Sequence, residues 1–122
     1  MLTHQLLRDD GILLVRPEGP IQASDFESVA KLVDPYIAEK GKLRGVMIEA
    51  PSFPGWETFA ALLSHLRFVR DHHRLISKIA AVSDSTILSI LPQLANHFVK
   101  AEVRHFNAKD RETALAWLRG GG

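Results

Sequence analysis

The sequence predicts an α/β domain with elements in the order β-β-α-β-α-β-α-β-α, a mostly parallel sheet, an antiparallel N-terminal edge strand and packed helices. Two observations support this fold class. Short apolar segments alternate with longer segments in which apolar residues recur every three or four positions, as in strands that alternate with helices and pair in parallel. Only the first two apolar segments follow each other directly, across an Asp-Asp-Gly turn, which favours an antiparallel hairpin at one edge.

Size and composition favour one globular domain. The chain has 122 residues, of which 46% are hydrophobic and 24% are charged. A chain of this length can bury a sizeable core without disulfides or metals. We expect a single domain over residues 1–119, followed by frayed glycines at 120–122.

Charge and cysteine content exclude several classes of partner. Fifteen basic and 14 acidic residues give a formal net charge of +1, which provides no general attraction to nucleic acid. The absence of cysteine removes disulfides and thiol chemistry, and is compatible with a reducing compartment. The first residues lack the pattern of a secretory signal, and no apolar run reaches about 18 residues. We therefore expect a cytoplasmic protein, either free or bound peripherally to the inner face of the membrane.

The first part of the chain contains a hairpin and a helix. Strands are expected at residues 4–8 and 12–16, because Asp and Gly in the turn between them tolerate positive φ. The helix that follows is expected to be capped by Ser24 or Asp25, and Pro35 predicts a kink or break inside it. Its expected buried stripe consists of Phe26, Val29, Ala30, Val33 and Ile37.

The rest of the chain repeats a strand–helix pattern. The expected elements are a strand at 45–50, a helix at 57–72, a strand at 78–82, a helix at 87–98 that is interrupted near Pro92, a strand at 103–106 and a final helix, capped by Asn107, that ends at Leu118. The strand at 45–50 is almost wholly apolar, so we expect it to be covered on both faces.

The helix at 57–72 has two faces of different character. Its expected core face consists of Phe59, Leu62, Leu63, Leu66 and Val69. At 100° per residue Phe68 falls about 180° from Phe59, so Phe68 is expected to face outward beside Ala61 and His65. The basic residues that follow, with Asp71 as the only acid among them, are Arg67, Arg70, His72, His73, Arg74 and Lys78. This pattern is typical of a helix at an anionic membrane interface, and equally of an ordinary amphipathic helix with a solvated basic end.

Several stretches, taken in order, carry a family resemblance. They are Gly19 followed by residues 23–26, then Phe-Pro-Gly-Trp-Glu at 53–57, Lys-Ile-Ala-Ala-Val at 78–82, Ala-Glu-Val-Arg-His-Phe at 101–106 and Ala-Leu-Ala-Trp-Leu at 114–118. Over nearly its whole length the chain resembles the SpoIIAA-like family, a bacterial group related to STAS domains. The resemblance implies a STAS-like fold with structural kinship to CRAL-TRIO lipid-binding domains, although fold kinship alone is a poor guide to function.

The chain departs from the phosphorylated STAS regulators in one motif. Those proteins carry Asp-Ser-Ser or Asp-Ser-Thr at the start of the helix after the middle strand, where this chain has Pro-Gly-Trp-Glu-Thr at 54–58. The string Asp84-Ser85-Thr86 follows the next strand instead. We interpret it as a helix N-cap and not as a phosphorylation site.

The loop before the second helix contains two large aromatic residues, Phe53 and Trp56. It follows the expected carboxyl end of a parallel strand, where ligands of open α/β sheets bind. Loops usually face water, so large apolar side chains in them need an explanation. Trp56 either packs back on the following helix as a hydrophobic staple, or forms the wall or lid of an apolar pocket, or inserts into a lipid surface.

The sequence offers little for metal or catalytic chemistry. The six histidines, which form no His-Glu-x-x-His motif, are His4, His65, His72, His73, His97 and His105. Glu49 and Asp84 are expected at the ends of neighbouring strands, where two carboxylates can share a proton or bind a cation. An enzyme that uses them is the weakest hypothesis, because no nucleophile is placed beside them by spacing. We expect no catalytic residue, metal or cofactor.

These observations lead to one functional hypothesis and one alternative. The chain is expected to be a non-catalytic binding module that holds a small lipophilic ligand between the sheet and the helix after Trp56, with that helix as a movable lid that touches a membrane. The candidate ligand- and membrane-binding residues are Phe53, Trp56, Phe59, Leu63, Arg67, Phe68 and Arg70. The alternative is a STAS-like protein-interaction regulator without the usual phosphorylation motif, in which Phe68 contacts a partner protein or a second copy.

Overall fold

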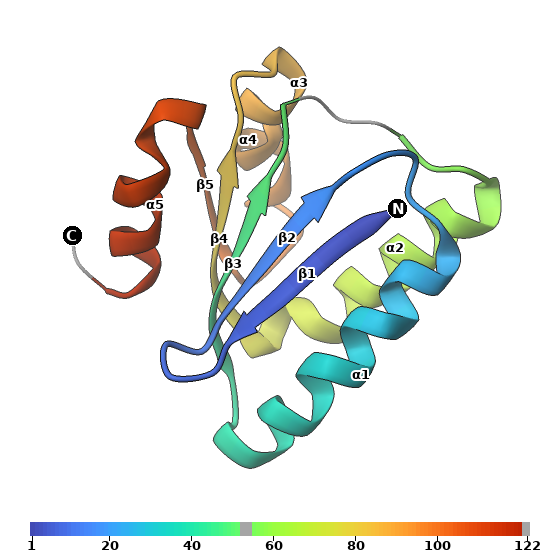
Figure 1. Cartoon of the computed structure of the whole chain (residues 1–122), viewed down its shortest axis with the longest axis horizontal. Coiled ribbons are helices and arrows are strands. Elements are labelled where there is room, and N and C mark those ends of the chain that lie inside the picture. The colour runs from blue at the N-terminus through green and yellow to red at the C-terminus, as the bar shows by residue number, and fades with distance from the viewer. Residues whose placement is uncertain (52–54, 121–122) are drawn as a thin grey trace.

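A single sheet lies at the centre of the structure (Figure 1). The computed structural model describes residues 1–51 and 55–120, and within them five strands pair in the order β1-β2-β3-β4-β5. The strands are β1 (Leu2–Leu7), β2 (Ile12–Pro17), β3 (Leu43–Glu49), β4 (Ile76–Val82) and β5 (Glu102–Phe106). β1 is antiparallel to β2 and each later pair is parallel, which confirms the predicted α/β fold class.

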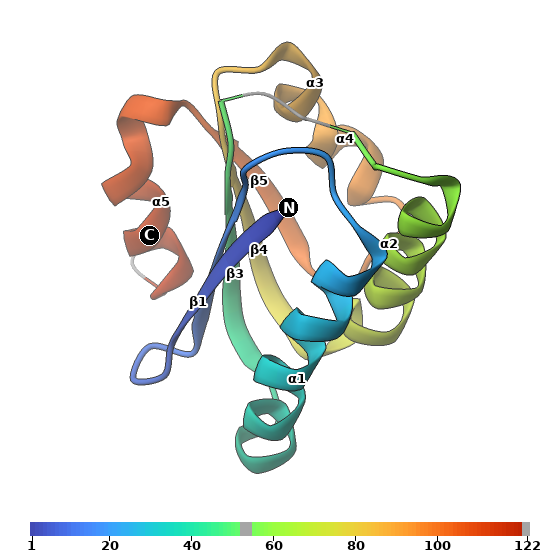
Figure 2. The same ribbon diagram turned by 45° about the vertical axis from the view of Figure 1, so that its right-hand side comes forward.

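Helices cover the two faces of the sheet unequally (Figures 1 and 2). The helices are α1 (Ala23–Lys40), α2 (Phe59–His72), α3 (Thr86–Ser89), α4 (Leu91–Ala95) and α5 (Arg111–Leu118). Figure 2 shows α5 on one side of the sheet and α1, α2 and α4 on the other. The helix layer formed by α1, α2 and α4 is therefore larger than the layer formed by α5.

The β1–β2 connection forms the predicted hairpin. The backbone N–H of Gly11 donates to the carbonyl of Leu7 at 2.8 Å, and Gly11 has a φ of 68°. A side chain at this position would be strained by the positive φ. A Cβ would also lie 2.7 Å from the hydroxyl of Tyr36, so the turn requires glycine for two reasons.

Helix α1 differs from its prediction at two points. It begins at Ala23 with Gln22 as N-cap, before the expected caps Ser24 and Asp25; the carboxylate of Asp25 instead accepts a hydrogen bond from the backbone N–H of Gln22 at 2.7 Å. The helix also runs through Pro35 to Lys40, so the expected break is wrong. A proline removes one backbone donor, whereas the apolar residues on both sides of it pack into one core.

Strand β3 is covered on both faces, as predicted. Val46 packs in the core beneath α1, and Met47 packs in the core beneath α5. Gly45 permits the close approach of α5, since a Cβ there would lie 2.7 Å from Cδ2 of Leu118. The absent side chain thus sets how near α5 lies to the sheet.

The segment between β4 and β5 is broken where the sequence predicted. α3 ends at Ser89 and α4 starts at Leu91, so Pro92 lies in the first turn of α4. Ser85 is the N-cap of α3, as interpreted, although its side chain makes no capping hydrogen bond.

Beyond α4, a side-chain amide ties the segment to the sheet. Asn96 Nδ2 donates to the carbonyl of Val103 at 3.0 Å, and its Oδ1 accepts from the N–H of Val103 at 3.0 Å. These paired bonds join the end of the α4 segment to β5.

Candidate functional site

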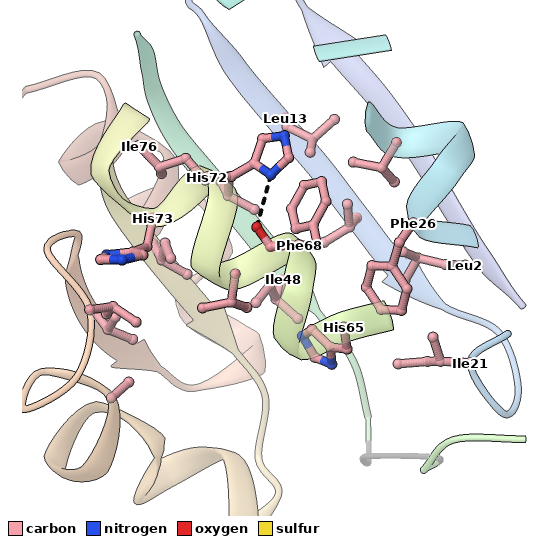
Figure 3. Close-up of a pocket in the computed structure, with 18 of the residues that line it drawn as sticks. Leu2, Leu13, Ile21, Phe26, Ile48, His65, Phe68, His72, His73 and Ile76 are labelled. Atoms are coloured by element: carbon pink, nitrogen blue, oxygen red, sulfur yellow. Dashed lines mark hydrogen bonds between the residues drawn. The ribbon is translucent and has the colours of Figure 1, made fainter. Parts of the chain in front are cut away.

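An apolar cavity of about 480 Å³ lies between the sheet and helices α1, α2 and α4 (Figure 3). Its floor is a row of side chains that the strand register aligns across β2, β3, β4 and β5, namely Leu13, Val46, Ile79 and Val103. Alternate residues of a strand point to the same face, so Val15 and Ile48 form a second row beside the first. The floor therefore consists of the sheet residues that point away from α5.

Helical side chains form the walls of the cavity. Phe26 comes from α1, and His65, Phe68 and His72 come from α2 (Figure 3). Beyond α4, Val99 lines the far end. Apart from the indole of Trp56, the polar side-chain atoms of the described lining are imidazole nitrogens. The cavity is therefore apolar over almost all of its surface.

A row of stacked rings joins α1 to α2 along this wall. Phe26 stacks on His65 with 4.8 Å between ring centroids and 21° between ring planes, and lies 5.9 Å from Phe68. Phe68 in turn stacks on His72 at 4.0 Å and 15°. Ring pairs of this kind add about 0.5–1.5 kcal/mol beyond the apolar area they bury, so this row stabilises the position of α2 against α1.

This ring row reverses the expected orientation of α2. Phe68 packs against the core and Ala61 is fully buried, whereas the expected core residues Phe59, Leu63 and Leu66 are 73%, 37% and 56% exposed. Of the other two expected core residues, Leu62 is partly buried and Val69 lines the cavity. The helix has two stripes at helical spacing, and hydrophobicity alone favours the leucine stripe. The stripe with the histidines faces inward because Nδ1 of His65 and both ring nitrogens of His72 have partners, and because the His65 ring stacks on Phe26.

Trp56 is positioned by pairing between the segments that precede α1 and α2. The N–H of Ile21 donates to the carbonyl of Gly55 at 2.9 Å, and the N–H of Glu57 donates to the carbonyl of Ile21 at 2.8 Å. The Gln22 side chain adds a 2.6 Å hydrogen bond to the Glu57 carboxylate. Trp56 both lines the cavity and packs back on α2, so the staple and wall hypotheses each describe part of its environment.

His65 is a neutral acceptor at the cavity wall. Its Nδ1 accepts a hydrogen bond from Trp56 Nε1 at 3.1 Å, which requires a lone pair on that nitrogen. Burial lowers the pKa of His65 below its usual value, in agreement with the neutral form. Its Nε2–H has no hydrogen-bond partner among the described residues and is not sealed from solvent. The ring therefore offers one donor to a ligand.

His72 links α2 to α1 at the other end of the ring row. Its Nδ1 lies 2.8 Å from the carbonyl oxygen of Phe68 (dashed in Figure 3), and its Nε2 lies 2.7 Å from Oδ1 of Asp34. Both neighbours are acceptors, so the ring fills both bonds only when both nitrogens carry a proton. His72 is buried, and it fastens the cavity wall to α1.

The expected basic cluster is divided between the two sides of the sheet. Lys78 lies on the α5 side, where its Nζ donates to the carbonyl of Trp117 at 3.0 Å and lies over the indole ring. His73 is also occupied, because its Nδ1 accepts from the N–H of Lys100 at 2.8 Å. The exposed cations that remain beside α2 are Arg67, Arg70 and Arg74.

The two rim carboxylates have separate structural partners. Glu49 accepts from Arg16 at 2.6 Å and from Arg111 at 3.0 Å. Burial by itself would raise the pKa of Glu49, but hydrogen bonds and charge from the two arginines outweigh it and hold the pKa below its usual value. Asp84 accepts from the backbone N–H of Ala108 at 3.0 Å.

A second, more polar cleft of about 520 Å³ includes Glu49 and Arg16 at the carboxyl ends of the parallel strands. Arg16, and Arg111 from outside the cleft, neutralise Glu49, and the carboxylate of Glu18 also lines the cleft.

Residues 1–51 and 55–120, which the structure describes, form neither a metal-binding cluster nor a membrane-spanning helix. No group of three or more His, Cys, Asp or Glu side chains in them could hold a metal ion. No helix formed by them combines the length and apolar character that a bilayer crossing requires.

The structure divides the candidate site residues into two groups. Trp56 and Phe68 line the cavity. Phe59, Leu63, Arg67 and Arg70 lie on the outer side of α2, and Phe53 lies outside the described residues.

Sequence reasoning missed the cavity residues Phe26, His65 and His72. One signal was available: Ala61, His65, Phe68 and His72 share one helical face at spacings of four, three and four. Together with Phe26 of α1, which stacks on His65, the position of His72 on this face identifies it as the inner face of α2.

Comparisons with known proteins bear on this architecture. Residues 12–119 match the family model described as SpoIIAA-like. A search of the curated proteins found no match. Among solved structures, the chain is similar to an uncharacterized protein of the DUF3478 family with a SpoIIAA-like fold from Shewanella loihica PV-4, with a TM-score of 0.72 and 21% identity. That alignment covers 97% of this chain and 92% of the other, and at this identity it shows the fold alone.

Proposed function

We propose, on the premise that the chain belongs to the SpoIIAA-like family, that it is a non-catalytic binding module whose cavity holds a small lipophilic ligand. Membership of the family supports a binding or regulatory module in general. The proposal of a lipophilic ligand concerns the cavity between the sheet and α2. The pairing of the rim carboxylate Glu49 with two arginines supports the non-catalytic part of the proposal.

The cavity is the observation that carries the proposal. Protein interiors are packed as densely as organic crystals and leave few voids larger than a water molecule. A volume of about 480 Å³ lies within the range of small-molecule sites. An apolar cavity does not hydrogen-bond water and takes up apolar molecules instead. An apolar ligand would restore the contacts that the lining side chains lack.

The polar groups of the wall narrow the chemistry of the ligand. His65 offers one donor, Nε2–H, while both ring nitrogens of His72 are occupied within the protein. His73 also lines the cavity, and because its Nδ1 accepts from the N–H of Lys100, its Nε2–H is a second donor. The lining fits a molecule with an apolar body and one or two hydrogen-bond-accepting groups.

Uptake of the solvatochromic dye Nile red tests the cavity. We expect saturable binding at one site with a blue shift of dye emission. The double variant Val46→Phe/Ile79→Phe places two rings on the cavity floor, and we expect at least about tenfold weaker binding, equivalent to 1.4 kcal/mol. Ala116→Phe adds a ring at an exposed position of α5 and serves as the control. Equal affinity of the double variant and the parent would reject the cavity as the site.

Solvent extraction identifies a natural ligand. Native mass spectrometry of protein isolated from its own host, followed by extraction and mass analysis, is expected to yield a stoichiometric lipophilic molecule. The double cavity variant is expected to lose this molecule and Ala116→Phe to retain it.

A STAS-like protein-interaction regulator remains the second candidate. The observation in its favour is the exposed apolar side of α2, at Phe59 and Leu66. This candidate would be supported over the first if a stoichiometric protein partner co-purified with the parent but not with Phe59→Ser, and if no lipid could be extracted.

A further inference from the structure

We propose that the outer edge of β1 pairs with β1 of a second copy of the chain, antiparallel and about a two-fold axis at His4, so that two sheets join into one. The inference is independent of any ligand of the cavity. β1 ends the strand order β1-β2-β3-β4-β5, and in Figure 2 it is the front strand, with none of the labelled helices drawn across its outer side. Among the described residues, this side of β1 is therefore open.

The hydrogen bonds to β2 leave part of the β1 backbone facing outward. The carbonyl of Met1 accepts from the N–H of Glu18 at 2.8 Å, and the register continues this pairing along the strand without interruption. In an antiparallel pair, residues that bond to the neighbouring strand alternate with residues whose N–H and C=O point the other way. Leu2, His4 and Leu6 therefore present their N–H and C=O groups at the edge.

The two edges of the sheet differ in their protection. At the β5 edge, the side-chain amide of Asn96 bonds to both the C=O and the N–H of Val103, so these groups are occupied within the chain. β1 lacks the usual protective devices, since it contains no Lys or Pro and its six residues pair with β2 without a bulge. An open strand of this kind is a template for one further strand.

The pattern of β1 selects a second copy as that strand. Residues 2–6 are Leu-Thr-His-Gln-Leu, an order that is symmetric in polarity about His4. With His4 at the two-fold axis, Leu2 lies opposite Leu6 of the other copy, and Thr3 lies opposite Gln5. All three outward-facing residues then form hydrogen-bonded pairs, and each pair exchanges two backbone hydrogen bonds. Any other symmetric register leaves at least one of them without a partner in β1.

Side chains and charge agree with this register. Leu2 and Leu6 pack against the core beneath α1, so their contact across the axis would extend an existing apolar layer. Thr3 and Gln5 are exposed and point to the opposite face of the sheet. β1 contains no Asp, Glu, Lys or Arg, so the two-fold axis brings no formal like charges directly opposite each other.

Sedimentation velocity of the full chain tests the pairing. A standard interface uses about 20–30 residues on each partner, so a single strand predicts a reversible dimer whose fraction rises between about 1 μM and about 1 mM. His4→Pro removes the outward N–H at the axis and keeps the bonds to β2, because proline is tolerated where an edge N–H faces solvent. We expect this variant to be monomeric throughout. Glu102→Lys, at an exposed position of β5, is the control and should dimerise like the parent.

A matched pair of charge variants tests the register without proline. Thr3→Lys/Gln5→Lys places like charges opposite each other across the axis, whereas Thr3→Lys/Gln5→Glu places opposite charges there. Both variants change the same two exposed positions, so they differ chiefly in the contact between copies. We expect the second variant to dimerise about tenfold more tightly than the first.

Three results would overturn the inference. A parent chain that stays monomeric over the whole concentration range, including one whose β1 binds a segment of another protein, would reject a second copy as the partner. A dimer that persists in folded His4→Pro would reject pairing through the β1 edge. Equal dimerisation of the two charge variants would reject the register centred on His4.

Discussion

Nε1 of Trp56 donates a hydrogen bond to Nδ1 of His65 over 3.1 Å, and so joins the segment before α2 to the inner face of that helix. The bond exists only while Nδ1 carries a lone pair, and burial holds the pKa of His65 below its usual value of 6.5. Acid protonates this nitrogen and removes the acceptor. The contact between Trp56 and the cavity wall is therefore sensitive to pH.

The first prediction concerns acidification. Because the pKa of His65 is lower in the folded chain than in the unfolded chain, the unfolded chain binds more protons below about pH 6.5. The free energy of unfolding should fall as pH falls from about 6.5 through the folded pKa, and His65 should contribute no pH dependence above that range. Chemical denaturation over this range measures it. His65→Leu should show a flatter profile, and an unchanged profile would contradict the prediction.

Fluorescence of Trp56 reports the protonation of His65, because the two side chains are hydrogen-bonded. In a Trp117→Phe background the remaining indole is Trp56, and its emission should shift as His65 protonates. The same shift in His65→Leu would assign it to another group.

The second prediction concerns the link between His72 and Asp34. Asp34→Ala leaves Nε2 of a buried ring without its partner, so the free energy of unfolding should decrease by about 1–2 kcal/mol. Glu39→Ala removes an exposed acid from the same helix, whose contact with Lys40 is 3.9 Å long, and should change stability by less than about 0.5 kcal/mol. Equal effects of the two substitutions in urea denaturation would show that the Asp34 bond contributes nothing.

The third prediction concerns Glu49. Glu49→Gln should lower the free energy of unfolding by at most about 1 kcal/mol at neutral pH, because its partners are partly exposed and screened. The folded pKa of Glu49 is depressed, so this stabilisation is present above its usual value of 4.5 and disappears as pH falls through the folded pKa. Glu112→Gln, at a side chain that is mostly exposed, should have a smaller effect. A difference in the free energy of unfolding between the parent and Glu49→Gln that grows as the pH falls would contradict the assignment.

The fourth prediction concerns the approach of α5 to the sheet. Gly45→Ala adds a methyl group at 2.7 Å from Leu118 Cδ2, and overpacking of this kind costs about 1–3 kcal/mol. Gly19→Ala meets nothing within 4 Å and should leave the melting temperature nearly unchanged. Thermal unfolding of the two variants is a direct comparison, and a stable Gly45→Ala would show that α5 can shift outward freely.

The two proline predictions show where local reasoning works. The interruption near Pro92 is present, since α3 ends before it and α4 begins beside it. The break at Pro35 is absent, although the same ring chemistry applies. The difference lies in packing: the apolar residues on both sides of Pro35 bury in one core beneath α1, which outweighs the loss of one backbone hydrogen bond.

The orientation of α2 shows where local reasoning fails. Periodicity identified two stripes and assigned the inner role to Phe59, Leu63 and Leu66. Ring stacking on Phe26, from a helix more than thirty residues earlier, selected the stripe with His65 instead. Four of the seven candidate site residues consequently lie outside the cavity, on the outer side of α2.

The sequence by itself determined the order of strands and helices, the hairpin at Gly11 and the parallel sheet, because turn chemistry and hydrophobic periodicity act between residues that are close in the chain. Only the tertiary structure decided which face of α2 turns inward, and hence which side chains line a cavity and which face outward. That decision depends on Asp34, Phe26 and the row of sheet residues beneath them, whose contacts with α2 are set by packing between segments distant in sequence.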